Sequence, residues 1–296
     1  MRCSRFFVAL LLGFASCTPQ ARIEEHALTN KGAHDGYTPS GIHYVWTGNS
    51  TAPAVVLIHA SGLDLRMWDR EASVLSRSFR VLRYDLRGHG STRFAPHPDA
   101  PYEELDELLN LLGLAQVSLV GLSTGALVAT DFAVAYPKRV SRLVLASPNV
   151  SGYVPTERME WFGPIAAAAR AGRPDQAAAL FAESPPIKVE DEGSPSAGLG
   201  RRLHDLVIQN ARMWSDTSQP SRALAPPAIG RLGSITAKTL VMVGSNDMKD
   251  VRLVADTLAR SIRDVRLVII PEGGHMLSFS APVRFDEELF AFLARR

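Results

Sequence analysis

Short, almost continuous apolar runs alternate with amphipathic stretches along most of this 296-residue chain. Apolar runs rich in Val and Leu are typical of parallel strands that are covered on both faces. We expect strands over residues 43–46, 54–58, 81–84, 117–120, 143–146, 239–243 and 265–270, and helices over residues 68–76, 102–112, 124–136, 251–260 and 282–294. This alternation predicts an α/β fold with a doubly wound, mostly parallel sheet.

The alternation stops between Pro148 and about Ser234. Here the pattern predicts helices over residues 166–170, 176–181 and 203–214, separated by breaks that are rich in Pro and Gly. We therefore predict a helical insertion at residues 148–235, within a core made of residues 39–147 and 236–296. The length suits one α/β domain that carries such an insertion.

The pentapeptide Gly121-Leu122-Ser123-Thr124-Gly125 lies between the expected strand 117–120 and the expected helix that follows it. In a strand–turn–helix context, the pattern G-x-S-x-G predicts a nucleophile elbow. Glycines on both sides remove Cβ atoms that would collide in so sharp a turn. The Ser123 hydroxyl then projects near the N-terminus of a helix, where negative charge is favoured.

A serine nucleophile needs a base and an acid that orients the base, and two later loops supply candidates. Asp247 follows the strand 239–243, and His275 follows the strand 265–270. Asp250 remains an alternative acid, although it could instead cap the next helix. His59 and His89 are the rival histidines. The order Ser123, Asp247, His275 is typical of α/β-hydrolases.

Three further segments resemble the α/β-hydrolase superfamily. Residues 54–62 are similar to its third strand and oxyanion loop, residues 83–91 to its D-x-R-G-x-G-x-S turn, and residues 136–145 to the link after the nucleophile helix. The resemblance implies the α/β-hydrolase fold, with residues 148–235 as a cap over the site.

The same resemblance assigns roles to individual residues. It implies Ser123 as nucleophile, His275 as general base and Asp247 as orienting acid, with an oxyanion hole formed by the backbone amides of Ser61 and Thr124. One departure is Ala60, which replaces the glycine of the family's His-Gly pair. Because alanine tolerates a positive φ poorly, this loop must use ordinary backbone angles or carry strain.

These residues predict a serine hydrolase that acts on a small ester-like substrate, a carboxylic ester or a lactone, through an acyl-enzyme. The superfamily also contains perhydrolases, carbon–carbon bond hydrolases and acyltransferases, and the fold does not choose among them. Haloalkane dehalogenases and epoxide hydrolases need a carboxylate where Ser123 stands. A non-catalytic binding lipoprotein is the alternative from another class. No histidines show metal-ligand spacing with carboxylates, so neither metal nor cofactor is expected.

The first residues have the pattern of an export signal. Arg2 and Arg5 precede an apolar stretch at residues 6–14, and Phe14-Ala15-Ser16-Cys17 resembles a bacterial lipobox. We expect residues 1–16 to be a lipoprotein signal peptide, Cys17 to carry a lipid, and residues 17–38 to form a tether. An ordinary secretory signal is the alternative. The resemblance implies an exported protein in the bacterial cell envelope, at the outer membrane in a Gram-negative organism because Thr18 follows Cys17.

The net charge of the full chain is +2, and loss of Arg2 and Arg5 with the leader leaves the remainder near neutral. Neither a basic patch nor a basic stripe points to nucleic acid. The expected partners are a small-molecule substrate and, through the lipid, a membrane surface. Trp161, Phe162, Met213 and Trp214 lie within the insertion. They could form an apolar wall of the binding site or pack the insertion onto the sheet.

Overall fold

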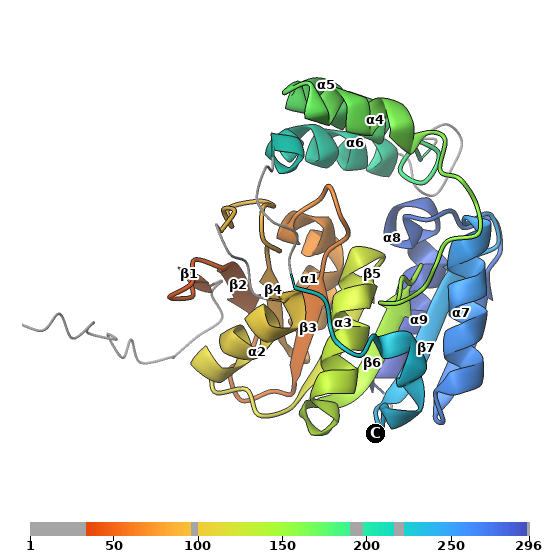
Figure 1. Ribbon diagram of the computed structural model, residues 1–296. Helices are drawn as coiled ribbons and strands as arrows, with labels where there is room; N and C mark the ends of the chain where they lie inside the picture. Colours follow the sequence, from red (N-terminus) through yellow and green to blue (C-terminus); the bar gives the residue numbers. More distant parts are fainter. Residues whose placement is uncertain (1–33, 96–99, 190–197, 216–221, 295–296) are drawn as a thin grey trace, which may run out of the picture. The chain divides into compact units, whose positions relative to one another are not determined.

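The computed structural model describes residues 34–95, 100–189, 198–215 and 222–294. Within these ranges the chain forms an eight-stranded sheet with the order β1-β2-β4-β3-β5-β6-β7-β8 (Figure 1). The strands are β1 (His34–Tyr37), β2 (His43–Thr47), β3 (Ala54–Ile58), β4 (Arg80–Tyr84), β5 (Val117–Leu122), β6 (Val140–Ala146), β7 (Lys238–Gly244) and β8 (Val265–Ile270). Among these described strands, β1 with β2 and β2 with β4 pair antiparallel, and all other pairs are parallel. The predicted α/β class is confirmed.

Helices cover both faces of this sheet. They are α1 (Asp69–Leu75), α2 (Pro101–Leu111), α3 (Thr124–Ala135), α7 (Lys249–Ser261) and α9 (Pro282–Ala294). Buried residues of α2, α3 and α7 share one hydrophobic core with Val56 and Ile58 of β3. Buried residues of α1 and α9 share a second core with Val55 and Leu57. Successive side chains of a strand therefore enter opposite cores, which is why the strands read as unbroken apolar runs.

Three helices lie between β6 and β7: α4 (Phe162–Arg170), α5 (Pro174–Ala182) and α6 (Leu199–Gln209). They lie above the sheet in Figure 1. Ile165, Ala177 and Leu203 from these helices belong to the same core as Ala60 and Met276 of the sheet's loops. The expected helix 203–214 instead ends at Gln209, and a short 3-10 helix, η3 (Ala211–Ser215), follows it.

Polar side chains tie α6 to loops at the end of the sheet. The buried Asn210 amide donates to Asp64 Oδ2 at 2.7 Å, and its oxygen accepts from Gly90 N at 2.9 Å. Arg202 donates to Asp69 Oδ2 at 2.6 Å. The Asn210 amide also donates to Leu206 O at 2.9 Å, within the last turn of α6. The Asn210 side chain, at the C-terminal end of this helix, therefore also attaches the helix to the core.

Two elements depart from the sequence-based expectations. Residues His34–Tyr37, which fall inside the expected tether 17–38, form β1 at the sheet edge, with His34 opposite Trp46. Three of the four side chains are exposed, and the sequence here does not alternate between apolar and polar residues. The pattern therefore predicted no strand at these positions. The short helix α8 (Leu277–Ser280), directly after His275, was also not expected.

The expected signal peptide, Cys17 and most of the expected tether lie outside the described residues. Among the helices that the described ranges contain, none has the length and apolar character needed to cross a membrane.

Candidate active site

Ser123 occupies a strained turn between β5 and α3. Its backbone has φ 55° and ψ −112°, a combination that side-chain-bearing residues rarely adopt. A Cβ on Gly121 would lie 2.2 Å from Gly125 O, and a Cβ on Gly125 would lie 2.1 Å from Ile58 O. Both glycines are therefore required by close backbone contact, and the second contact brings the end of β3 against the start of α3.

The side chains of Ser123, His275 and Asp247 form one hydrogen-bonded chain. Ser123 Oγ lies 2.9 Å from His275 Nε2, and His275 Nδ1 lies 2.9 Å from Asp247 Oδ1. The three residues are 7%, 7% and 5% exposed, respectively. A carboxylate only accepts, so Nδ1 carries the ring proton and Nε2 is the nitrogen that accepts from the serine hydroxyl. This is the geometry that transfers a proton from a serine to an imidazole.

Close backbone contacts also hold together the loops that carry the histidine and the acid. A Cβ on Gly244, at the end of β7, would lie 2.0 Å from Gly273 O. Asn246 N donates to the same carbonyl at 3.0 Å. Gly274 N, directly before His275, donates to Ser280 Oγ of α8 at 3.1 Å. The α8 helix, which sequence patterns missed, thus braces the histidine loop.

Asp250 lies in the first turn of α7 and points elsewhere. Its carboxylate accepts from the hydroxyls of Tyr153 and Thr156, at 2.8 and 2.6 Å, and from the backbone amides of Thr156 and Glu157. Desolvation works to raise the pKa of Asp250, but these hydrogen bonds outweigh it and hold the pKa well below its usual range. Asp250 therefore anchors the segment after β6, while Asp247 contacts His275.

The two backbone amides expected at an oxyanion hole belong to neighbouring segments. Thr124 is the first residue of α3, and Ser61 follows the end of β3 that packs against Gly125. Within the described ranges, neither amide has a hydrogen-bond partner. Ala60 is not among the non-glycine residues with positive φ there, so the loop uses ordinary angles at this position, and Gly62 takes the positive φ of 79° instead.

His59 and His89 brace this loop through backbone groups. His59 Nδ1 donates to Ala60 O at 2.8 Å, and its Nε2 accepts from Leu86 N at 2.9 Å. His89 Nδ1 donates to Arg87 O at 3.0 Å, and its Nε2 accepts from Gly62 N at 3.3 Å. Burial lowers the pKa of both rings, that of His89 to about 4. Both rings are thus neutral, and neither offers a free nitrogen to Ser123.

A buried carboxylate that sequence reasoning did not single out completes this support. Asp85 accepts from the backbone amides of Leu65 and Ser91, each at 2.8 Å, and from His43 Nδ1 at 2.7 Å. The hydrogen bond to Asp85 raises the pKa of His43. Asp85 is the first residue of the D-x-R-G-x-G-x-S turn, so the motif was the signal that could have identified it.

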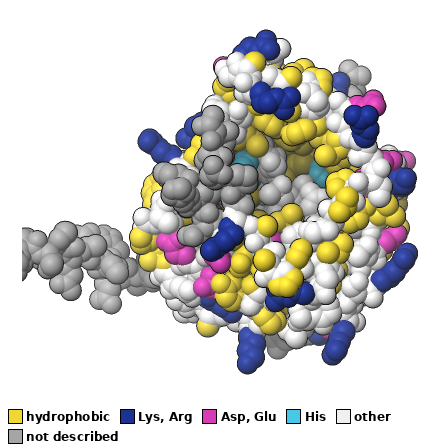
Figure 2. Space-filling model, viewed as in Figure 1, with side chains coloured by type: hydrophobic (Ala, Val, Ile, Leu, Met, Phe, Trp, Pro, Cys, Tyr) yellow, Lys and Arg dark blue, Asp and Glu magenta, His cyan; other side chains and the backbone are white. Residues whose placement is uncertain are grey.

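Four aromatic side chains, Trp161, Phe162, Phe181 and Trp214, form what we call the aromatic cluster. Ring centroids lie 5.3 Å apart for Phe181 and Trp214, 5.8 Å for Trp161 and Phe162, 6.3 Å for Phe162 and Trp214, and 6.5 Å for Trp161 and Phe181. Phe181 of α5 also meets the oxyanion loop, since a Cβ on Gly62 would lie 2.4 Å from its ring. Figure 2 shows a hollow below the inserted helices, bordered by hydrophobic side chains, with histidine visible in it.

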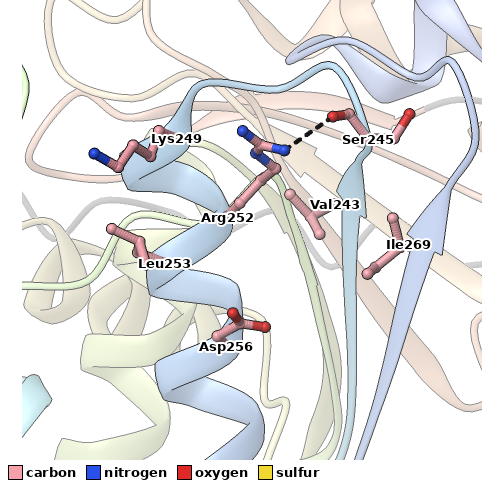
Figure 3. A pocket seen from close by; sticks show the side chains of 7 residues that line it. All are labelled: Val243, Ser245, Lys249, Arg252, Leu253, Asp256 and Ile269. Atoms are coloured by element: carbon pink, nitrogen blue, oxygen red, sulfur yellow. Dashed lines mark hydrogen bonds between the residues drawn. The ribbon is translucent and has the colours of Figure 1, made fainter.

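A separate surface groove lies between α7 and the strands β7 and β8 (Figure 3). It has a volume of about 360 Å³ and contains none of Ser123, Asp247 and His275. Its lining residues are Val243, Ser245, Lys249, Arg252, Leu253, Asp256 and Ile269. This groove is therefore not the site at which Ser123 could meet a substrate. Over the described ranges, no group of three or more His, Cys, Asp or Glu side chains is arranged to hold a metal ion.

Comparison with known proteins gives the class. Residues 55–288 match the model of the alpha/beta hydrolase family, and the chain belongs to this family. A provisionally assigned carbamate hydrolase, RutD, of Variovorax paradoxus (strain S110) is 28% identical over 86% of this chain and 96% of its own length. The 3-oxoadipate enol-lactonase 2 of Acinetobacter baylyi (strain ATCC 33305 / BD413 / ADP1) is 25% identical over 86% of this chain and 93% of its own length.

Solved structures agree with this class. The crystal structure of a hydrolase from Pseudomonas aeruginosa PA01 has a TM-score of 0.70 and 27% identity, and the match covers 89% of this chain and 99% of the other. The chain is thus a hydrolase of the α/β-hydrolase family.

Proposed function

We propose that this protein is a serine hydrolase that cleaves a small carboxylic ester or lactone through an acyl-enzyme. The observation that carries the proposal is the continuous hydrogen-bonded chain from Ser123 through His275 to Asp247, located at a strained turn at the end of β5. The relatives support this substrate class, since one is an enol-lactonase and another a provisionally assigned carbamate hydrolase. Lactones, esters and carbamates all present an acyl carbon that is bonded to a leaving oxygen or nitrogen.

In the proposed reaction, Ser123 Oγ attacks the acyl carbon while His275 Nε2 takes the hydroxyl proton. Asp247 keeps the proton on Nδ1 and stabilises the imidazolium that forms. The oxyanion is bound by the amides of Thr124 and Ser61, and each such donor typically contributes about 3 kcal/mol to the stability of the transition state. His275 then returns the proton to the leaving group.

Hydrolysis of the acyl-enzyme completes the cycle. Water enters, His275 accepts its proton, and the hydroxyl adds to the acyl carbon. Collapse releases the acid and restores the Ser123 hydroxyl. The whole sequence uses side chains and backbone amides of this chain together with water. The inserted helices α4–α6 act in it as a cap over the site.

Loss of turnover in single variants tests the proposal. We expect kcat/KM for 4-nitrophenyl acetate to fall by about 1000-fold or more in Ser123→Ala and in His275→Ala, because the members of a triad act as a unit. His204→Ala is the control, since this histidine of α6 has a side chain that is 44% exposed. Equal activity in wild type and in the Ser123 and His275 variants would refute the assignment.

We also propose that the chain is lipid-anchored in a bacterial cell envelope through Cys17. The support lies in the sequence alone: a positively charged start, a short apolar stretch and the lipobox-like Phe14-Ala15-Ser16-Cys17. The Cys17→Ser variant should lose retention in the membrane fraction and incorporation of labelled fatty acid. Retention that is unchanged in this variant would reject the anchor.

A further inference from the structure

The aromatic cluster is only partly withdrawn from solvent. Phe181 is 7% exposed, as expected of a packing residue, whereas Phe162 is 38% exposed. Trp161 and Trp214 have intermediate exposure and lie at the margin of the core rather than within it. Partly exposed aromatic side chains that contact one another are typical of ligand-binding walls, because rings that serve packing alone become buried.

The cluster lies next to the position where the acyl group would react. Phe181 packs against Gly62, which directly follows Ser61, one of the two expected oxyanion donors. From Phe181 the ring contacts continue to Trp161 on one side and to Trp214 on the other. A substrate whose carbonyl oxygen meets Ser61 N thus has the aromatic surface of Phe181 beside it.

Two arginines near these residues in the sequence, Arg66 and Arg212, already form hydrogen bonds or ion pairs within the protein. Arg66 forms an ion pair with the buried Asp64, at 2.5 Å, and donates to Gln209. Arg212, beside Trp214, donates to the carbonyls of Gly90 and Thr92 at 2.9 and 3.1 Å. Both guanidinium groups already donate to protein oxygens, and Arg66 is also paired with a carboxylate, so these contacts favour an uncharged ligand group over a carboxylate.

We propose that the aromatic cluster binds an uncharged aryl group of the substrate, and that this hydrolase prefers esters or lactones which carry such a group. Ring stacking against Trp161 and Trp214 removes apolar surface from water and holds the ester near Ser123. This inference rests on the proposed function, because it names the substrate class of the same site.

Simple esters that isolate the aryl group provide the test. Ethyl acetate is the reference, ethyl phenylacetate carries the ring on the acyl side, and benzyl acetate carries it on the alcohol side. Each kcat/KM is divided by the rate constant for hydroxide hydrolysis of the same ester. We expect one of the two aryl esters to exceed ethyl acetate by about tenfold or more, from the burial of one ring. Monoethyl succinate, an anionic ester, should show no such gain.

Variants of the cluster then locate the preference. Trp161→Leu and Trp214→Leu should each lower kcat/KM for the preferred aryl ester several-fold more than kcat/KM for ethyl acetate. Leu253→Ala is the control, because Leu253 lies on α7 and, at 38%, is as exposed as Phe162. If a leucine variant does not fold, Trp161→Met or Trp214→Met takes its place, because methionine fills space without a ring.

The outcomes separate the two proposals. A wild-type enzyme that hydrolyses ethyl acetate through Ser123 but shows no aryl preference overturns this inference alone. An aryl preference that survives in both tryptophan variants overturns it as well, since the ring would then bind elsewhere. Turnover of all these esters by Ser123→Ala would instead remove the proposed function.

Discussion

The surroundings of Ser123 and the inserted helices α4–α6 are held in place by different means. Around Ser123, backbone atoms approach backbone atoms: glycines at positions 121, 125 and 244 each lie where a Cβ would come within 2.2 Å of a carbonyl oxygen. Buried neutral histidines and the carboxylate of Asp85 then fix the adjoining loops. In the inserted helices, the ties to the core are side chains such as Asn210 and Arg202.

This difference indicates a division of labour. Backbone contacts leave little freedom to vary the residue, so they fix the geometry in which Ser123 Oγ lies 2.9 Å from His275 Nε2. Side-chain ties and ring contacts can be exchanged with moderate energetic cost. If the proposed function holds, we expect changes in the inserted helices to alter substrate preference more than they alter the reaction itself.

The largest effect on kcat should come from replacing Asp247, the proposed orienting acid of His275. Asp247→Asn should reduce kcat roughly 10⁴-fold, because an amide in place of the carboxylate favours the wrong tautomer of His275. Asp250→Asn, three residues away, should leave kcat within about threefold and instead lower the unfolding free energy by about 1–2 kcal/mol, because its bonds to the Thr156 segment weaken. Steady-state kinetics and urea unfolding of both variants make the comparison. A similar loss of kcat in both would contradict the assignment of the two carboxylates.

Sequence patterns predicted much of the core because its signals are local. Each strand is a buried apolar run, and the elbow around Ser123 is specified by glycines within two residues of it. The three side chains that the sequence singled out do lie together in the structure. The choice between Asp247 and Asp250 needed the structure, because the groups that engage Asp250 lie 94 and 97 residues away in the chain.

A second prediction contrasts one glycine from each region. Gly125→Ala places a Cβ 2.1 Å from Ile58 O, and we expect the unfolding free energy to fall by about 3 kcal/mol or more. Gly163→Ala in α4 places a Cβ with no atom within 4 Å outside the neighbouring residues, and it should change stability by less than about 1 kcal/mol, because Pro164 offsets the gain in helix propensity. Urea denaturation of both variants measures the difference. Equal tolerance of alanine at the two positions would remove the proposed distinction between the regions.

The pH dependence of stability should reveal the buried histidine beneath the oxyanion loop. The pKa of His89 is lowered to about 4 by burial, from an ordinary value near 6.5. Between these values the unfolded chain binds a proton that the folded chain does not, so stability falls as the pH drops from about 6.5 to 4. At about 1.4 kcal/mol per pKa unit, the loss from this group reaches about 3 kcal/mol.

The variant His89→Gln isolates this contribution. Stability of the variant between pH 4 and 7 should depend on pH less steeply than that of wild type, whereas His204→Gln on the exposed face of α6 should change little. His43 acts in the opposite direction, since its pKa is raised, but it is present in all three proteins. An unchanged slope in His89→Gln would show that the ring is not held neutral.

The smallest of these effects should come from the tie between α6 and the core. Asn210→Ala removes hydrogen bonds to Asp64 and Gly90, and we expect a loss of about 2 kcal/mol in unfolding free energy. KM should rise more than kcat falls, because the loosened helices carry the binding surface rather than the reacting groups. Ile208→Ala, an exposed neighbour, is the control. A pure kcat effect would place Asn210 in the reacting machinery instead.

The remaining features were beyond sequence patterns for physical reasons. Trp161, Phe162 and Trp214 were recognised as candidates for an apolar wall, but Phe181, which links them to Gly62, carries no local signal that sets it apart from any buried helix residue. Ala60 posed a question about backbone angles that the sequence could not answer, since the positive φ moved to Gly62. The strand β1 has no apolar alternation of its own, and it is formed by pairing with β2 at the edge of the sheet.

The central claim is that the Ser123 hydroxyl is the nucleophile activated by His275. Mass spectrometry after treatment with a fluorophosphonate tests it most directly. We expect one adduct per chain, on the peptide that contains Ser123, with labelling abolished in Ser123→Ala and strongly slowed in His275→Ala. Ester hydrolysis by a protein whose Ser123 stays unmodified, or an adduct on a different residue, would contradict it.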